Sequence, residues 1–215
     1  MWWTVLLPAK SLPEAKSRLA GATGDATAHR ELVLAIRADT MAAARAADGV
    51  ARLVLVVDTA AAAQEALLAP AQTFVQTRPG LNAALAEAAA DAAARWPSHG
   101  VAALVGDLPA LRPEDLAAAL AVACASERAF VPDAAGTGTT LLTALPGIAL
   151  EPAFGVASAA RHGVGAAPIP AGASLRRDVD TAEDLAGAAE LGLGPATAAV
   201  LARLDPSPAV HLGPA

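Results

Sequence analysis

Residues 101–111 read VAALVGDLPAL, five apolar residues followed at once by Gly106 and Asp107. A short apolar run bounded by turn residues is typical of a strand that is buried on both faces of a sheet. We expect a helix over residues 112–125, because Pro113 suits the first turn of a helix. An apolar strand, an acidic loop and a helix in succession indicate a parallel sheet that is covered by helices.

The same alternation of apolar runs and Ala-rich segments occupies the first 125 residues. We expect strands over residues 3–7, 53–57, 73–76, 101–105, 129–132 and 139–144. We expect helices over residues 29–47, 59–69, 81–96, 112–125, 182–191 and 196–204, with a short one over 157–162. Strands that alternate with helices imply right-handed crossovers, so the predicted fold is a three-layer α/β sandwich with a mostly parallel sheet. A single domain over residues 1–205 is expected, with a loose tail over 206–215.

Composition excludes several classes of protein. Hydrophobic residues make up 55% of the 215 and the net charge is −6, which is too apolar for a disordered chain. A single cysteine, Cys124, excludes a disulfide framework and a zinc site built on cysteines, and we expect it to be a buried thiol within a helix. A net negative charge argues against a nucleic-acid partner. Because no apolar run reaches the length of a membrane span, we expect a soluble cytoplasmic protein.

A group of cations follows the first predicted strand. Lys10, Lys16 and Arg18 lie within nine residues of a chain that is acidic as a whole. Such a cluster suits a triphosphate, although a solvated helix start has the same pattern. No GxxxxGK[ST] or GxGxxG occurs, so a P-loop and a dinucleotide fingerprint are excluded.

Carboxylates mark two further candidate positions. Asp107 follows a buried strand, at the edge of the sheet where ligands of α/β proteins gather. Asp178 and Asp180 alternate in an extended segment beside Arg176 and Arg177, so the two carboxylates point the same way. Carboxylates suit Mg²⁺ that also contacts substrate phosphates, while a turn or a surface ion-pair network explains the same residues equally well.

Small and hydroxyl residues mark the last candidates. Residues 133–140 read DAAGTGTT, and residues 154–162 read FGVASAARH. Both offer amide and hydroxyl groups to an anion, or else are ordinary loops. The four histidines are scattered without metal-ligand spacing, and we expect His162 at the surface rather than on a substrate.

Six segments in this order resemble one family. PxKxLxxAKxRL begins at residue 8, GLNAAL at 80, GDLPAL at 106, DxxGTGTTLL at 133, FGxxSAxxH at 154 and RRDVDTxEDL at 176. Together they resemble the 2-phospho-L-lactate and phosphoenolpyruvate guanylyltransferases of coenzyme F-420 biosynthesis, over residues 7–191. The resemblance implies a Rossmann-like sandwich of the nucleotide-diphospho-sugar transferase type. It also implies transfer of GMP from GTP to a small phosphorylated three-carbon acid, with release of pyrophosphate.

The resemblance also implies roles for individual residues. Acceptor ligands would be Thr140, Gly155 and Ser158, and Mg²⁺ ligands of catalytic importance would be Asp107 and Asp180. The residues near the nucleotide would be Lys10, Lys16, Arg18, Gly80 and Asn82, with Lys10 and Lys16 also catalytic. The chain departs from the family at Ala157, where the usual FGPGS loop has glycine, which leaves the backbone path of this loop open.

Alternatives remain at this point. The Arg- and Ala-rich composition favours phosphoenolpyruvate over 2-phospho-L-lactate as the acceptor. Another nucleotidyltransferase of the same fold, such as a molybdenum-cofactor guanylyltransferase, would carry LAGGxSxRxG in place of Pro8-Ala9-Lys10. A glycosyltransferase and a non-catalytic nucleotide-binding module are further alternatives. The activated product suggests handover to a downstream transferase.

Overall fold

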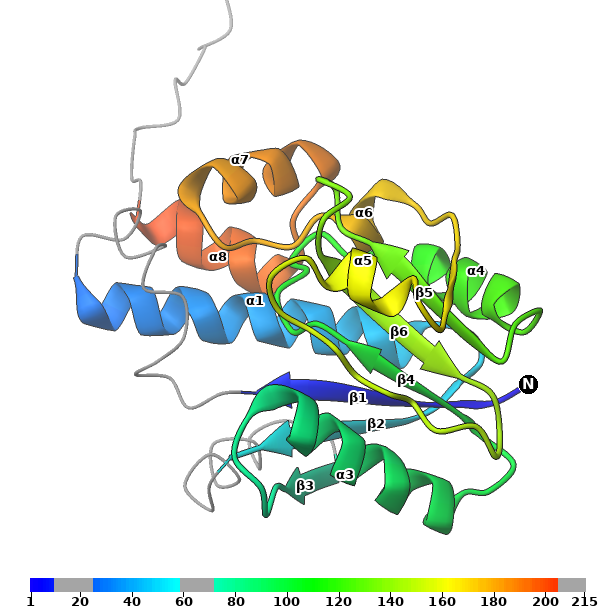
Figure 1. The fold of residues 1–215 in the computed structure, drawn as a ribbon. Helices are drawn as coiled ribbons and strands as arrows, with labels where there is room; N and C mark the ends of the chain where they lie inside the picture. The colour runs from blue at the N-terminus through cyan, green and yellow to red at the C-terminus, as the bar shows by residue number, and fades with distance from the viewer. Residues whose placement is uncertain (10–24, 59–71, 205–215) are drawn as a thin grey trace, which may run out of the picture.

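One sheet organises the chain. The computed structural model describes residues 1–9, 25–58 and 72–204, and seven strands in these ranges pair in the order β3-β2-β1-β4-β6-β5-β7 (Figure 1). The strands are β1 (Trp3–Ala9), β2 (Val50–Val57), β3 (Gln72–Val75), β4 (Gly100–Leu104), β5 (Arg128–Pro132), β6 (Thr139–Ala144) and β7 (Ala167–Pro168). The pairing is parallel except at β6, which runs antiparallel to β4 and β5. The prediction of a mostly parallel α/β sheet is confirmed.

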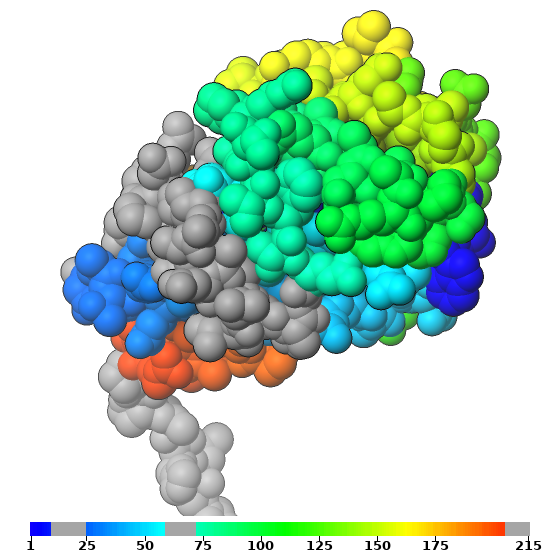
Figure 2. Space-filling model, turned by 90° about the horizontal axis from the view of Figure 1, so that it is seen from below, coloured from blue at the N-terminus to red at the C-terminus, as the bar shows by residue number. Residues whose placement is uncertain are grey.

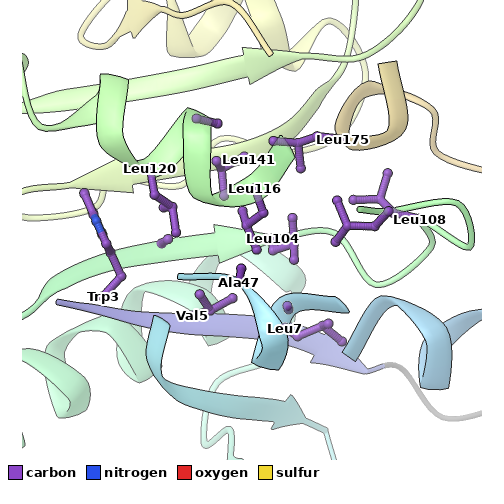
Figure 3. Close-up of a cluster of buried hydrophobic side chains, with 14 of the residues drawn as sticks. Trp3, Val5, Leu7, Ala47, Leu104, Leu108, Leu116, Leu120, Leu141 and Leu175 are labelled. Carbon is purple, nitrogen blue, oxygen red and sulfur yellow. The ribbon is translucent and has the colours of Figure 1, made fainter. Parts of the chain in front are cut away.

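Helices cover both faces of this sheet. They are α1 (Ala26–Ala46), α3 (Leu81–Arg95), α4 (Pro113–Ala123), α5 (Ser158–His162), α6 (Ala173–Arg176), α7 (Ala182–Leu191) and α8 (Pro195–Leu204). One core joins α1 and α4 to β1, β2, β4 and β6, with Val5, Leu7 and Leu104 completely buried (Figure 3). The other face packs against α3, where small alanines allow close approach to the strands. Helices α7 and α8 pack against the outer side of α1.

Caps explain where two of the helices begin. Helix α1 starts at Ala26, three residues before the predicted start, because the Asp25 side chain accepts hydrogen bonds from the amides of Thr27 and Ala28. Helix α7 starts at Ala182, as predicted, and Thr181 and Asp184 form a reciprocal capping box there.

The structure differs from the predictions at some elements and at Cys124. The short elements β7 and α6 were not predicted. The expectation of a buried Cys124 is wrong, because α4 ends one residue earlier and the thiol is exposed. The predicted helix over 59–69 and the predicted tail over 206–215 lie outside the described residues. In the part of the chain that is described, no helix is both long and apolar enough to cross a membrane.

Gly100 gives a test of the packing between β1 and β4. It pairs with Trp3, whose side chain Figure 3 shows in the core, and a Cβ at residue 100 would lie 2.5 Å from two ring carbons of that buried indole. We expect Gly100→Ala to lower the free energy of unfolding by about 2 kcal/mol, since the core must shift to make room. Urea denaturation measures the loss, and Gly165→Ala is the control because its Cβ would meet nothing closer than 3.9 Å. Equal stability of the two variants would contradict the packing described here.

Candidate functional site

The carboxyl edge of the parallel strands gathers the segments that the sequence singled out. Strands β1, β2, β3 and β4 run parallel and end at this edge, and β5 also ends there. Strand β6 runs the opposite way, so Thr139 and Thr140 at its start lie beside the end of β4. Loops at this edge carry the candidate residues, as expected for the binding edge of an open α/β sheet.

Hydrogen bonds link these segments in a continuous series. Val105 donates its amide hydrogen to the Thr140 carbonyl at 3.0 Å, and Val179 donates to the Asp107 carbonyl at 3.0 Å. Ala134 donates to the Arg176 carbonyl at 2.7 Å, and Ala159 donates to the Thr137 carbonyl at 3.1 Å. Segments 105–109, 133–140, 154–162 and 176–180 therefore form one structural unit, although they are up to 75 residues apart in sequence.

Four aspartates give this edge its negative charge. Burial, followed by the negative charges of Asp107, Asp180 and Asp133, raises the pKa of Asp178 to about 7. Because each of these charges disfavours ionisation of Asp178, Asp107, Asp180 and Asp133 each lie within electrostatic reach of Asp178. The backbone bond from Val179 to Asp107 thus brings the segment of Asp178 and Asp180 next to Asp107, although the two segments are about 70 residues apart in sequence.

This charge bears on the predicted Mg²⁺ site. Carboxylate oxygens are the ligands that Mg²⁺ prefers, and a divalent cation would relieve the repulsion around Asp178. The donor set therefore fits the ion. Within the described ranges, no three His, Cys, Asp or Glu side chains are placed so that they would hold a metal by themselves. Mg²⁺ usually takes one or two carboxylates and completes its coordination with water and substrate phosphates.

A bulge alters the start of β6. Pro132 pairs with Thr139 while Val131 pairs with Leu141, so Thr140 has no counterpart on β5. The Thr140 side chain is completely buried, and its Oγ1 has no hydrogen-bond partner among the described residues. Buried hydroxyl groups usually have a partner, and bulges are common beside functional sites. Thr140 is therefore suited to hydrogen-bond a ligand.

The loop from Ala153 to Ser158 carries the other two predicted acceptor ligands. Gly155 has φ of +114° and Ala157 has φ of +55°, so the loop turns sharply before α5. The Ser158 side chain is buried, and its amide bonds the Gly155 carbonyl at 3.0 Å. Ala157 adopts the left-handed conformation that glycine favours, so this chain keeps such a path without the glycine.

This conformation predicts the effect of restoring glycine. A left-handed L-residue costs about 1–2 kcal/mol, which outweighs the added chain entropy of glycine in the unfolded state. We expect Ala157→Gly to raise the free energy of unfolding by up to about 1 kcal/mol in urea denaturation. Ala88→Gly, in the middle of α3, is the control and is expected to destabilise by at least about 1 kcal/mol. If Ala157→Gly lost as much stability as Ala88→Gly, the left-handed backbone at Ala157 would not be strained.

His162 holds this loop from the side of α5. Its Nε2 accepts the Ala153 amide hydrogen at 2.9 Å, which assigns the ring hydrogen to Nδ1, 2.9 Å from the Thr139 Oγ1. Burial, and secondarily the charge of Arg161, lowers the pKa of His162 to about 4. The expectation of a surface histidine is wrong: the ring is buried against Phe130 and Phe154, and both nitrogens are engaged.

A pocket of about 200 Å³ lies next to this unit, at the ends of β1 and β2 and the first turn of α3. Its lining includes Pro8, Ala9, Asp58, Gln76, Gly80 and Leu81. Figure 2 shows α3 beside the segment around α5 on this side of the molecule. The predicted nucleotide residue Gly80 thus lines a pocket. Asn82 is not part of the lining of this pocket, and its side chain bonds the backbone of Phe154.

The lysines and arginines that the sequence singled out differ in what the structure shows of them. Lys10, Lys16 and Arg18 lie outside the described residues, so their predicted contacts with phosphates stay predictions. The Arg176 guanidinium donates to the carbonyls of Pro132 and Asp133 and fixes the loop after β5. No sequence signal pointed to this clamp, because its partners lie 43 and 44 residues away.

Comparison with known proteins identifies the family. No family model matches the chain. Phosphoenolpyruvate guanylyltransferase of Geodermatophilus obscurus is 53% identical over 207 residues, which cover 93% of this chain and 94% of the relative. The protein of the same name from Streptomyces coelicolor is 51% identical over 209 residues, covering 95% and 98%.

A solved structure shows the same fold. The putative nucleotide-diphospho-sugar transferase from Desulfovibrio desulfuricans matches with a TM-score of 0.68 at 16% identity, over 95% of this chain and 99% of that one. The predicted sandwich of the nucleotide-diphospho-sugar transferase type is thereby confirmed. Relatives about half identical over nearly their full length settle the family, and the chain belongs to the phosphoenolpyruvate guanylyltransferases.

Proposed function

We propose that the protein transfers GMP from GTP to phosphoenolpyruvate and releases pyrophosphate, as a step of coenzyme F-420 biosynthesis. The observation that carries this proposal is the joining of segments 105–109, 133–140, 154–162 and 176–180 at one edge of the sheet. These segments carry the resemblance to the family, and two relatives named phosphoenolpyruvate guanylyltransferase are about half identical to this chain. We place the nucleotide toward the pocket at Gly80 and the acceptor toward Thr140, Gly155 and Ser158.

The reaction is an in-line attack by a phosphate oxygen of the acceptor on the α-phosphorus of GTP. The new bond joins that oxygen to the α-phosphorus, and the bond from the α-phosphorus to the bridging oxygen of pyrophosphate breaks. The attacking oxygen is already an anion at neutral pH, so no general base is required. The one titratable ring in the described acceptor region agrees with this scheme, since both nitrogens of His162 are engaged within the protein.

The chain's own residues orient two anions and limit their repulsion. Thr140 offers a buried hydroxyl, and the turn at Gly155 and Ser158 offers small side chains and amides in a segment that bonds Thr137 and Thr139. We propose that Asp107 and Asp180 hold Mg²⁺, with Asp178 in the same acidic cluster. When bound there, Mg²⁺ supplies positive charge that lowers the repulsion between the two substrates. Lys10, Lys16 and Arg18 are proposed to bind the phosphates that leave as pyrophosphate.

The test is an acceptor comparison. Purified protein, GTP and Mg²⁺ are mixed with phosphoenolpyruvate, with 2-phospho-L-lactate or with no acceptor, and pyrophosphate release is followed by a coupled assay. We expect release with phosphoenolpyruvate to be the fastest and release without acceptor to be at background. Preference for 2-phospho-L-lactate would correct the acceptor, and background release with both acids would overturn the function.

One finer proposal follows from the same chemistry. The product is an activated mixed anhydride of a phosphate, so we propose its handover to a transferase that uses GMP as the leaving group. We expect that the downstream transferase, when added, changes the rate of the coupled reaction or forms a complex with this protein. No complex and no change in rate on mixing the two enzymes would oppose the proposal. Location in the cytoplasm remains a prediction from the sequence.

A further inference from the structure

The first turn of α3 touches two parts of the site. Gly80 and Leu81 line the pocket of about 200 Å³. The next residue, Asn82, turns its side chain away from that pocket and toward the loop that follows Ala153. Three consecutive residues therefore contact both the proposed nucleotide pocket and the proposed acceptor loop.

Asn82 binds both polar groups of the Phe154 backbone. Its Oδ1 accepts the Phe154 amide hydrogen at 2.8 Å, and its Nδ2 donates to the Phe154 carbonyl at 3.1 Å. The two residues are 72 positions apart, so this pair joins distant parts of the chain. A side-chain amide that pairs with both groups of one peptide unit fixes the position and also the orientation of that backbone.

His162 holds the residue directly before Phe154. The Ala153 amide donates to Nε2 of His162, so adjacent amides of the loop are bound from α3 and from α5. Gly155 follows at once, with φ of +114°, and Ser158 closes the turn onto the Gly155 carbonyl. The placement of the two proposed acceptor ligands thus depends on where Phe154 is held.

We propose that Asn82 is a positioning residue for the acceptor, which it serves by fixing the Phe154 backbone ahead of Gly155 and Ser158. This inference rests on the proposed function. It reassigns Asn82, which the resemblance placed on the nucleotide, because its amide is engaged with Phe154 and it does not line the pocket. Removal of the Asn82 side chain is expected to loosen the acceptor loop. The backbone of Gly80 and Leu81, which lines the pocket, is unchanged.

The test separates the two substrates kinetically. We expect Asn82→Ala to raise the KM for phosphoenolpyruvate by about tenfold, the order expected when two hydrogen bonds that order a loop are lost. The KM for GTP should stay within about twofold, because the altered side chain does not line the pocket. Asn82→Asp keeps an oxygen that accepts the Phe154 amide hydrogen and is expected to recover part of the acceptor KM. Asp91→Asn is the control, since Asp91 pairs with exposed Arg95 near the far end of α3.

A second readout does not depend on turnover. Amide hydrogen exchange followed by mass spectrometry should show faster exchange over residues 152–156 in Asn82→Ala than in the wild type or Asp91→Asn. Unchanged exchange in this segment, an acceptor KM within twofold of wild type, or an equal rise in both KM values would overturn the inference. Loss of the fold in both Asn82 variants would also overturn it, by showing a purely structural residue. Failure of the proposed function is distinguishable, because the wild type itself would then release no pyrophosphate with phosphoenolpyruvate.

Discussion

Asp107→Asn is expected to lower kcat for guanylyl transfer by a factor of about 10³ or more. Asp107 follows β4 and shares the acidic cluster with Asp178 and Asp180. An amide has the shape of the carboxylate but carries no charge, so it would bind the proposed Mg²⁺ more weakly. The repulsion between the two anionic substrates would then be less well neutralised. The measurement is steady-state pyrophosphate release at saturating GTP and phosphoenolpyruvate.

The fold should survive this substitution. Val179 bonds the backbone carbonyl of Asp107, which the variant keeps, and one of several like charges is removed. We therefore expect a Tm within a few degrees of wild type, with Asp180→Asn behaving alike. Asp91→Asn, at a partly exposed position of α3, controls for the loss of an aspartate. Retention of more than a tenth of kcat by Asp107→Asn would contradict the proposed metal role of Asp107.

Asp39→Ala is expected to lower the free energy of unfolding by about 3 kcal/mol, because two charge-assisted hydrogen bonds are lost at once. Asp39 lies on α1 and is only 6% exposed. Its two oxygens accept the amides of Ala196 at 3.0 Å and Thr197 at 2.7 Å, in the first turn of α8. The carboxylate thus caps a helix that is remote in sequence and complements its dipole.

The same pair of helices supplies the control. Glu31 on α1 bonds Arg203 on α8 at 2.8 Å, with side chains that are 51% and 61% exposed. Exposed pairs of this kind contribute under about 1 kcal/mol, so Glu31→Ala should change the urea midpoint little. Equal destabilisation by the two substitutions would show that the buried cap does not hold α8 on α1.

Much of the fold was predictable because its central strands β1 and β4 are short, apolar runs that are buried on both faces. The local sequence alone predicts the strands at residues 101–105 and 53–57. Helix α3 begins and ends within one residue of its prediction. The antiparallel direction of β6 was not predicted, although the connection from β5, residues 133–138, is too short for the crossover that a parallel pair needs. Elements as short as β7 and α6 have too few residues to show a period.

The site was predictable only in part, for a physical reason. Asp107, Thr140, Gly155 and Ser158 stand in motifs of fixed local spacing, and the fold brings those motifs together. The clamps of Asn82 and His162 depend on partners whose position only the folded backbone determines. Burial of the His162 ring between two phenylalanines likewise depends on tertiary packing.

The central claim is that the α-phosphorus of GTP moves to the acceptor. GTP labelled with phosphorus-32 at the α or at the γ position, incubated with phosphoenolpyruvate, Mg²⁺ and the protein, tests it directly. We predict that the α label appears in a product that contains the acid, and that the γ label appears in pyrophosphate. The γ label on the acid, or no transfer of the α label, would contradict the account.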